Sequence, residues 1–116
     1  KGKFKTWRIA GGCICCVSRI IFSRKLIEAG QSDDFDRVII EPSGIARASD
    51  LIDLIDRSTL KSVFEIHPIL CFVHPKTMAD GHVIREPLVR EQLEVADVII
   101  GNFYDQMSES DDSCFK

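Results

Sequence analysis

The class of fold is decided by one stretch, Val38-Ile39-Ile40-Glu41-Pro42-Ser43-Gly44. Three β-branched apolar residues in a row are typical of a short parallel strand buried on both faces. Similar apolar runs occupy residues 4–10, 66–73 and 96–100, and segments with helical spacing separate them, over residues 18–29, 45–56 and 87–95. Strands that alternate with helices predict βαβ crossovers, and therefore a parallel sheet with helices on both faces.

Polar or metal-ligating residues follow the ends of these apolar runs. They are Cys13, Cys15 and Cys16, then Glu41 to Gly44, then His74, and finally Asn102 to Asp105. In a parallel sheet, ligands bind outside the carboxyl ends of the strands. We therefore expect these four segments to converge on one edge of the sheet and to form a site there.

The bulk composition narrows the class of protein. The chain has 116 residues, 45% of them hydrophobic and 28% charged, and a net charge of -3. A single domain of this size can bury a core, and the acidic balance argues against nucleic acid or a membrane surface as a partner. Arg8 interrupts the first apolar stretch, so we do not expect a signal peptide. Five cysteines, two of them adjacent, do not suit a secreted disulfide framework, so we expect a cytoplasmic protein.

The cysteine turn, Gly11-Gly12-Cys13-Ile14-Cys15-Cys16, predicts a metal site. Thiolates are soft ligands that suit zinc and, together with imidazole, nickel or cobalt. Three thiols leave one coordination position open, which suits a metal that is handed on. The alternative is that Cys16 and a neighbour are small buried hydrophobes.

Other candidate residues have simpler interpretations. Cys71 lies inside an apolar run and is expected in the core, and Cys114 has no assigned role. His67, His74 and His82 are each able to donate a fourth metal ligand, with His74 ranked first because it ends a strand. Asp50, Asp53 and Asp56 follow one polar helix face and are expected to be a solvated surface rather than a metal cluster.

Together these segments resemble the CobW-like family of P-loop GTPases, relatives of the nickel-insertion GTPases of hydrogenase and urease maturation. Residues 12–16 look like that family's Cys-x-Cys-Cys metal motif, and residues 35–46 look like its acidic switch segment. Residues 92–100, followed by Asn102-Phe103-Tyr104-Asp105, are similar to the helix, strand and base-recognition loop farther along. The resemblance covers nearly the whole chain.

The resemblance implies a three-layer P-loop NTPase-like parallel sheet, with GTP and Mg²⁺ as cofactors and Zn²⁺, Co²⁺ or Ni²⁺ at the cysteine motif. Cys13, Cys15 and Cys16 would be the metal ligands. Glu41 would be the catalytic residue, which holds a Mg²⁺-bound water or orients the hydrolytic water. The residues that would bind the nucleotide and its Mg²⁺ are Glu41, Ser43, Gly44, Asn102 and Asp105. The alternative is that Glu41 caps the following helix and that residues 42–44 are only a turn.

The chain also departs from the family pattern. The phosphate loop, Gly-x-x-x-x-Gly-Lys-Ser/Thr, does not occur in the sequence. We therefore expect residues 1–116 to be a single partial domain, an internal fragment that lacks the phosphate-loop strand, exposes strand edges and does not hydrolyse nucleotide alone. Phe103 replaces the family's lysine, so the specificity for guanine or adenine is left open. His74 stands where the family usually has an aspartate.

The expected function is part of a GTP-binding metallochaperone that couples nucleotide hydrolysis to delivery of a transition metal to a client metalloprotein. One alternative is a non-catalytic metal-binding or partner-binding module derived from that family. Another is a thiol redox protein that uses Cys13 and Cys16, which have the spacing of a redox pair. The expected partners are nucleotide, metal and client, with oligomerisation left open and with no nucleic acid or membrane.

Overall fold

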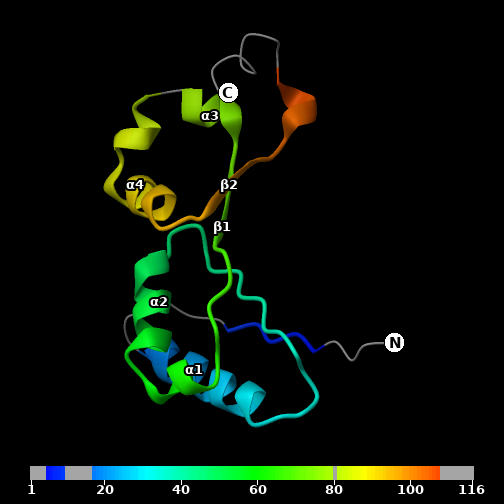
Figure 1. Cartoon of the computed structure of the whole chain (residues 1–116). Helices are drawn as coiled ribbons and strands as arrows, with labels where there is room; N and C mark the ends of the chain where they lie inside the picture. The colour runs from blue at the N-terminus through cyan, green and yellow to red at the C-terminus, as the bar shows by residue number, and fades with distance from the viewer. Residues whose placement is uncertain (1–4, 10–16, 80, 108–116) are drawn as a thin grey trace. The chain divides into compact units, whose positions relative to one another are not determined.

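The structure is a computed structural model of the chain, and it describes residues 5–9, 17–79 and 81–107 (Figure 1). The described helices and strands, with η for 3-10 turns, are α1 (Val17–Gly30), α2 (Ala48–Asp56), η1 (Thr59–Ser62), β1 (Leu70–Val73), α3 (Pro75–Ala79), η2 (Val83–Arg85), α4 (Pro87–Glu94), β2 (Val98–Gly101) and η3 (Tyr104–Gln106). They form two compact units, Lys1–Glu65 and Ile66–Lys116. The fold is mixed α/β, as expected.

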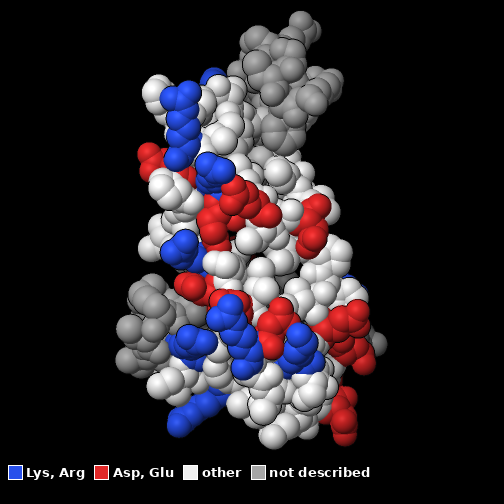
Figure 2. Space-filling model, turned by 60° about the vertical axis from the view of Figure 1, so that its left-hand side comes forward, with Lys and Arg blue, Asp and Glu red and all other residues white. Residues whose placement is uncertain are grey.

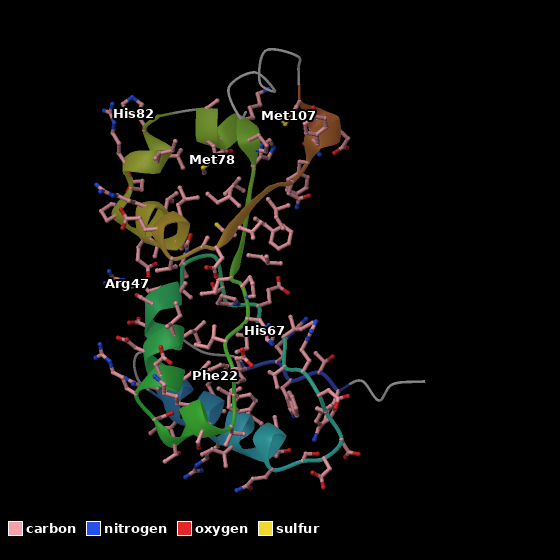
Figure 3. All side chains as sticks on the ribbon, viewed as in Figure 1. Phe22, Arg47, His67, Met78, His82 and Met107 are labelled. Atoms are coloured by element: carbon pink, nitrogen blue, oxygen red, sulfur yellow. The ribbon has the colours of Figure 1, made fainter. Side chains whose placement is uncertain are left out.

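The first unit is built on its two helices. One side chain each from α1, α2 and η1, namely Leu26, Ile55 and Leu60, forms a buried cluster. Phe22 and Phe64 pack against this cluster, and Figure 3 labels Phe22 on α1. Apolar residues recur at helical spacing along α2, which presents one apolar side to the cluster. On α1, Leu26 belongs to the cluster, whereas Ile20, Ile21 and Ile27 are exposed. The sequence-based prediction of these two helices is confirmed.

Two predicted strands are wrong for the residues that the structure describes. Neither residues 5–9 nor residues 38–40 form a strand. Val38 and Ile40 still pack against the buried cluster, but Ile39 between them is 82% exposed. Residues 38–40 therefore alternate inward and outward like a strand, yet no ladder pairs them with a neighbouring strand in the described part of the chain.

Gly30 is needed at the end of α1 for packing and not for a left-handed backbone. It is the last residue of α1 and has no left-handed φ angle, and the helical pattern continues past it because the Gln31 N–H donates to the Ile27 carbonyl at 3.0 Å. A Cβ atom on Gly30 would lie 2.5 Å from Cγ1 of Val63 and 3.2 Å from the ring of Phe64. The glycine is therefore required by the close approach of the segment after η1.

The second unit contains the parallel pairing that the apolar runs predict. β1 and β2 form a two-stranded parallel sheet in which Leu70 pairs with Val98 and Val73 pairs with Gly101. The connection between them runs through α3, η2 and α4, which is the helical crossover that parallel strands need. Pro87 begins α4, where a missing N–H costs nothing. The short helix α3 was not predicted, although Pro75 stands at its first position.

The sheet is smaller and more open than the predicted one. Within β1, Val73 is buried, whereas Leu70 and Phe72, which alternate with it, are 51% and 63% exposed. Val98, opposite Leu70, is 45% exposed. The described residues thus leave apolar side chains of this sheet in solvent, so a larger sheet with helices on both faces is not seen in this part of the chain.

Candidate functional site

The carboxyl ends of β1 and β2 lie side by side, as the parallel register requires. The Asn102 N–H donates to the Val73 carbonyl at 2.8 Å, which extends the pairing one residue beyond the strands. Beyond the strands, the two segments diverge, because Pro75 begins α3 and Phe103 leads into η3. His74 follows β1 and Phe103 follows Asn102 after β2, and both belong to the segments that the sequence predicts at the functional edge.

The rings of His74 and Phe103 stack on one another. Their centroids lie 5.4 Å apart with an angle of 24° between the planes. Phe103 has a left-handed backbone, with φ 60° and ψ 35°, and its N–H donates to its neighbour's Oδ1, on Asn102, at 2.9 Å. Nδ1 of His74 is buried and has no hydrogen-bond partner in the described part of the chain. Sequence analysis singled out both rings but did not predict their contact.

Asp105 lies on η3 and is exposed. Asn102 is exposed as well, but its side-chain oxygen is engaged by the Phe103 N–H. The predicted base-recognition residues are therefore at one strand end together with His74. Half of the expected convergence, between the ends of β1 and β2, is confirmed.

The segment Glu41 to Gly44 belongs to the first unit and forms an exposed turn. The Ala46 N–H donates to the Ser43 carbonyl at 2.8 Å, and the Ile45 N–H lies 3.5 Å from Ser43 Oγ. A Cβ atom on Gly44 would meet no atom within 4 Å. The alternative in which Glu41 caps the next helix is wrong, since α2 begins at Ala48 and its N-cap residue is Arg47. Glu41 is left exposed to solvent.

Phe35, which precedes this segment, contacts Trp7 in residues 5–9. The ring of Phe35 meets the ring of Trp7 edge to face, with centroids 5.9 Å apart. Lys5 Nζ lies 5.0 Å from the centroid of the Trp7 ring and 3.2 Å from Glu28 Oε1 on α1. Residues 5–9 are therefore held against both α1 and the segment that leads to Glu41.

The predicted metal ligands Cys13, Cys15 and Cys16 lie outside the described residues, as does Cys114. Within the described residues, no cluster of three or more His, Cys, Asp or Glu side chains is placed to hold a metal ion. The convergence of the cysteine turn and of Glu41 with the end of the β1–β2 sheet stays a prediction. His67 precedes β1 and His82 precedes η2, and Figure 3 labels both.

Cys71 differs from its expected place in the core, because it is only partly buried. Burial raises the pKa of its thiol above the ordinary value of 9.0. The thiolate, which is the form that binds metals, is therefore less favoured at Cys71 than at an exposed cysteine.

The acidic face of α2 is a solvated surface, as predicted, and two of its carboxylates are in ion pairs. Asp53 lies 3.3 Å from Arg57 and Asp56 lies 3.6 Å from Lys61. Figure 2 shows Lys and Arg side chains interspersed with Asp and Glu side chains among the residues in view. None of the described helices is long and apolar enough to cross a bilayer.

A parallel β-strand pair joined by a helical crossover, with polar residues at its carboxyl ends, is the arrangement of α/β domains, which bind ligands at that edge of the sheet. Residues 2–115 match the family model described as "CobW/HypB/UreG, nucleotide-binding domain", and the chain belongs to this family. Among curated proteins it is similar to the zinc chaperone YeiR of Escherichia coli (strain K12), with 29% identity over 98 residues. The matched region is 84% of this chain and 30% of YeiR. No solved structure matches the chain.

Proposed function

We propose that this chain is part of a GTP-binding metallochaperone that binds zinc through Cys13, Cys15 and Cys16 and passes it to a client metalloprotein. The observation that carries the proposal is the family match over residues 2–115, within which the three thiols stand in the Cys-x-Cys-Cys pattern. The name of YeiR, a zinc chaperone, supports zinc over cobalt and nickel. The whole of residues 1–116 would be one partial nucleotide-binding domain in a three-layer P-loop fold.

The nucleotide role is proposed for residues whose surroundings suit it. Glu41 is exposed and carries a carboxylate, the kind of oxygen ligand that Mg²⁺ and its bound water accept. The side of Gly44 on which a Cβ atom would stand is open, so a phosphate has room there. Ser43 adds a hydroxyl beside it. In the second unit, Asn102 and Asp105 are the residues proposed to bind the base.

The experiment that tests this proposal measures metal. We expect the anaerobically purified chain to hold about one zinc ion per chain, and the triple variant Cys13→Ser, Cys15→Ser, Cys16→Ser to hold none. Cys71→Ala is the matched control, because Cys71 lies on β1 and outside the Cys-x-Cys-Cys pattern. A folded chain with no zinc, and no uptake in a competition titration, would remove the metallochaperone proposal.

A second candidate function is a non-catalytic metal-binding or partner-binding module. It is favoured by one feature of the sequence, the presence of Phe103 where the family has lysine. The two candidates differ in whether zinc binding is coupled to nucleotide binding. If zinc changes the affinity of the chain for Mg²⁺-GTP, the switch function is supported. If zinc binds and the affinity is unchanged, the module is the better description.

A further inference from the structure

Helix α1 carries more apolar surface than the first unit buries. One side of it is in the core, because Leu26 and Ala29 are each 4% exposed and Phe22 packs against the buried cluster. With about 3.6 residues per turn, Ile20 and Ile27 lie on the opposite side of the helix. They are 59% and 42% exposed, and a third isoleucine near them, Ile21, is 43% exposed. A helix needs one apolar side to join a core, so these three residues, the isoleucine side of α1, are a second apolar surface that faces solvent.

Free positive charge accompanies the isoleucine side. Arg24 lies one helical turn from two of the isoleucines, and Arg19 precedes the first of them. Both arginines are exposed, and neither has an ion-pair partner among the residues that the structure describes. Glu28 does not neutralise them, because it is held by Lys5 at 3.2 Å and by Lys25 at 2.6 Å. The surface is therefore apolar and basic, and it complements a partner surface that is apolar and acidic.

The isoleucine side also lies close to the proposed metal ligands along the chain. α1 begins at Val17, which directly follows Cys16 in the sequence. A helix rises about 1.5 Å per residue, so Ile20 and Ile21 lie within about 6 Å of the helix start along its axis. A protein that takes zinc by ligand exchange must bring a thiolate to about 2.3 Å from the ion. It must therefore also lie against the surface beside the cysteines.

We propose that the isoleucine side of α1 is the surface on which a client protein docks to receive the metal, through an amphipathic helix whose apolar residues are bordered by carboxylates. This rests on the proposed metal-delivery function and names the chemistry of the partner. Ile20 and Ile27 would pack between the apolar side chains of that helix, and Arg24 would pair with a carboxylate at its border.

An anionic membrane suits this surface less well. Helices that bind in a membrane interface have a long apolar side and a polar side rich in Lys and Arg. The isoleucine side has three apolar residues over two turns, and the carboxylate of Glu28 stands beside them. A protein helix of matching length and opposite charge is therefore the occupant that the charges favour.

The first test is a chemical-shift titration of the 116-residue chain with a peptide probe. The probe is a helical peptide of about 18 residues, with leucines at helical spacing bordered by glutamates. Its counterpart has lysine in place of every glutamate. We expect the acidic peptide to bind with a dissociation constant below about 1 mM and to shift the signals of α1. The basic peptide should bind at least about tenfold more weakly.

Variants separate docking from a change in stability. Ile20→Ser combined with Ile27→Ser should weaken binding of the acidic peptide at least about tenfold. Ile84→Ser, which changes an isoleucine of the second unit that is 43% exposed, is the matched control and should not weaken it. Arg24→Glu should weaken the acidic peptide and strengthen the basic one, each by about fivefold. A loss of stability would weaken both peptides, so this exchange of preference reports on the surface itself.

The second test measures metal transfer from the zinc-loaded chain. Each peptide is extended by Cys-Gly-Gly-Cys, whose two thiolates take zinc by ligand exchange without any change of oxidation state. The acidic version should remove zinc at least about tenfold faster than the basic one, because docking raises the effective concentration of its thiolates. The variant Ile20→Ser, Ile27→Ser should bind zinc as the unaltered chain does and should lose this advantage.

Several outcomes would overturn the docking surface. They are no binding of the acidic peptide at about 1 mM, equal binding of the two peptides, shifts away from α1, and equal losses in Ile84→Ser and the double variant. Binding to phosphatidylserine vesicles that the double variant loses, with no binding of the peptide, would assign the surface to a membrane and overturn the client. Zinc that is bound but removed equally fast by both peptides overturns docking and leaves the metal role. A chain that binds the acidic peptide at α1 but holds no zinc keeps the docking surface and removes the metal role.

Discussion

Oδ2 of Asp97 accepts a hydrogen bond from the backbone N–H of Ile69 at 2.8 Å, and so joins the starts of the two strands. The Asp97 and Val98 N–H groups both donate to the Ile69 carbonyl, at 3.0 and 3.1 Å. The amino ends of β1 and β2 are thus clamped by one carboxylate, while their carboxyl ends are joined by Asn102 and the ring stack. The register of the sheet is fixed at both ends.

Removing this clamp should loosen the sheet. We expect Asp97→Ala to lower the free energy of unfolding of the second unit by about 1 kcal/mol, the net value of an ordinary hydrogen bond, because the site is exposed. Asp97→Asn keeps an acceptor oxygen and should lose less than half as much. Amide hydrogen exchange across Leu70–Val73 measures both effects. Exchange in Asp97→Ala equal to that in the unaltered chain would mean that the carboxylate does not hold the strands.

Gly30 should not tolerate a larger residue. Alanine improves helix propensity by about 1 kcal/mol, but its Cβ would lie 2.5 Å from Cγ1 of Val63. Overpacking of this kind costs about 1–3 kcal/mol, so we expect Gly30→Ala to be destabilised by about 1 kcal/mol in urea unfolding. The residue in the way is a stiff β-branched side chain, which cannot swing aside easily.

The double variant checks the cause of that loss. Val63 is 53% exposed, so Val63→Ala alone should cost little. Adding Val63→Ala to Gly30→Ala should recover most of the stability, because the clashing methyl group is gone. A double variant as unstable as the sum of the two single ones would contradict the steric explanation.

The helices were predictable because their signals are local. The spacing of apolar residues predicted α1, α2 and α4 to within a few residues. The crossover required only that the strands in residues 66–73 and 96–100 pair with each other. The run at residues 38–40 has the same apolar character, but a strand exists only with a hydrogen-bonded neighbour. The sequence of residues 38–40 does not show whether a partner strand pairs with them.

The site was predictable in its parts and not in its contacts. His74 and Phe103 each stood out, one for ending a strand and one for replacing a lysine. Their stacking depends on the register of β1 against β2 and on a positive φ angle at a phenylalanine, where a glycine or asparagine is the usual occupant. Asp97 was missed for the same reason, since a carboxylate before a strand acquires its role only once the partner strand is in place.

The contact between Lys5, Trp7 and Glu28 should be visible by fluorescence, because Trp7 is the single tryptophan in the chain. Hydrogen bonds from Lys25 and then Lys5 lower the pKa of the Glu28 carboxyl below the ordinary value of 4.5. The folded state therefore binds the proton less well than the unfolded chain, and the stability that these contacts add is present above pH 4.5 and lost as the pH falls below it. The contribution is small, since Glu28 is exposed.

We expect Glu28→Gln to release Lys5 and to shift the Trp7 emission at pH 7 towards the spectrum that the unaltered chain shows at low pH. Lys61→Gln, which breaks an ion pair elsewhere in the first unit, is the matched control and should leave the emission unchanged. A spectrum of Glu28→Gln identical to that of the unaltered chain at every pH would show that Lys5 does not hold Trp7 in place.

The thiol of Cys71 should make the stability of the chain depend on pH in the alkaline range. Burial raises its pKa, so the folded chain keeps this proton when the unfolded chain has lost it. Stability linked to Cys71 is therefore complete below the unfolded value near 9.0 and is lost as the pH rises through the folded value. We expect the urea midpoint to fall more between about pH 8 and pH 10 in the unaltered chain than in Cys71→Ala, where this group is absent.

At about pH 8, alkylation of Cys71 by iodoacetamide should also be several-fold slower in the folded chain than in urea. Equal slopes for the two proteins, together with equal alkylation rates in the folded and unfolded chain, would mean that burial does not protect this thiol.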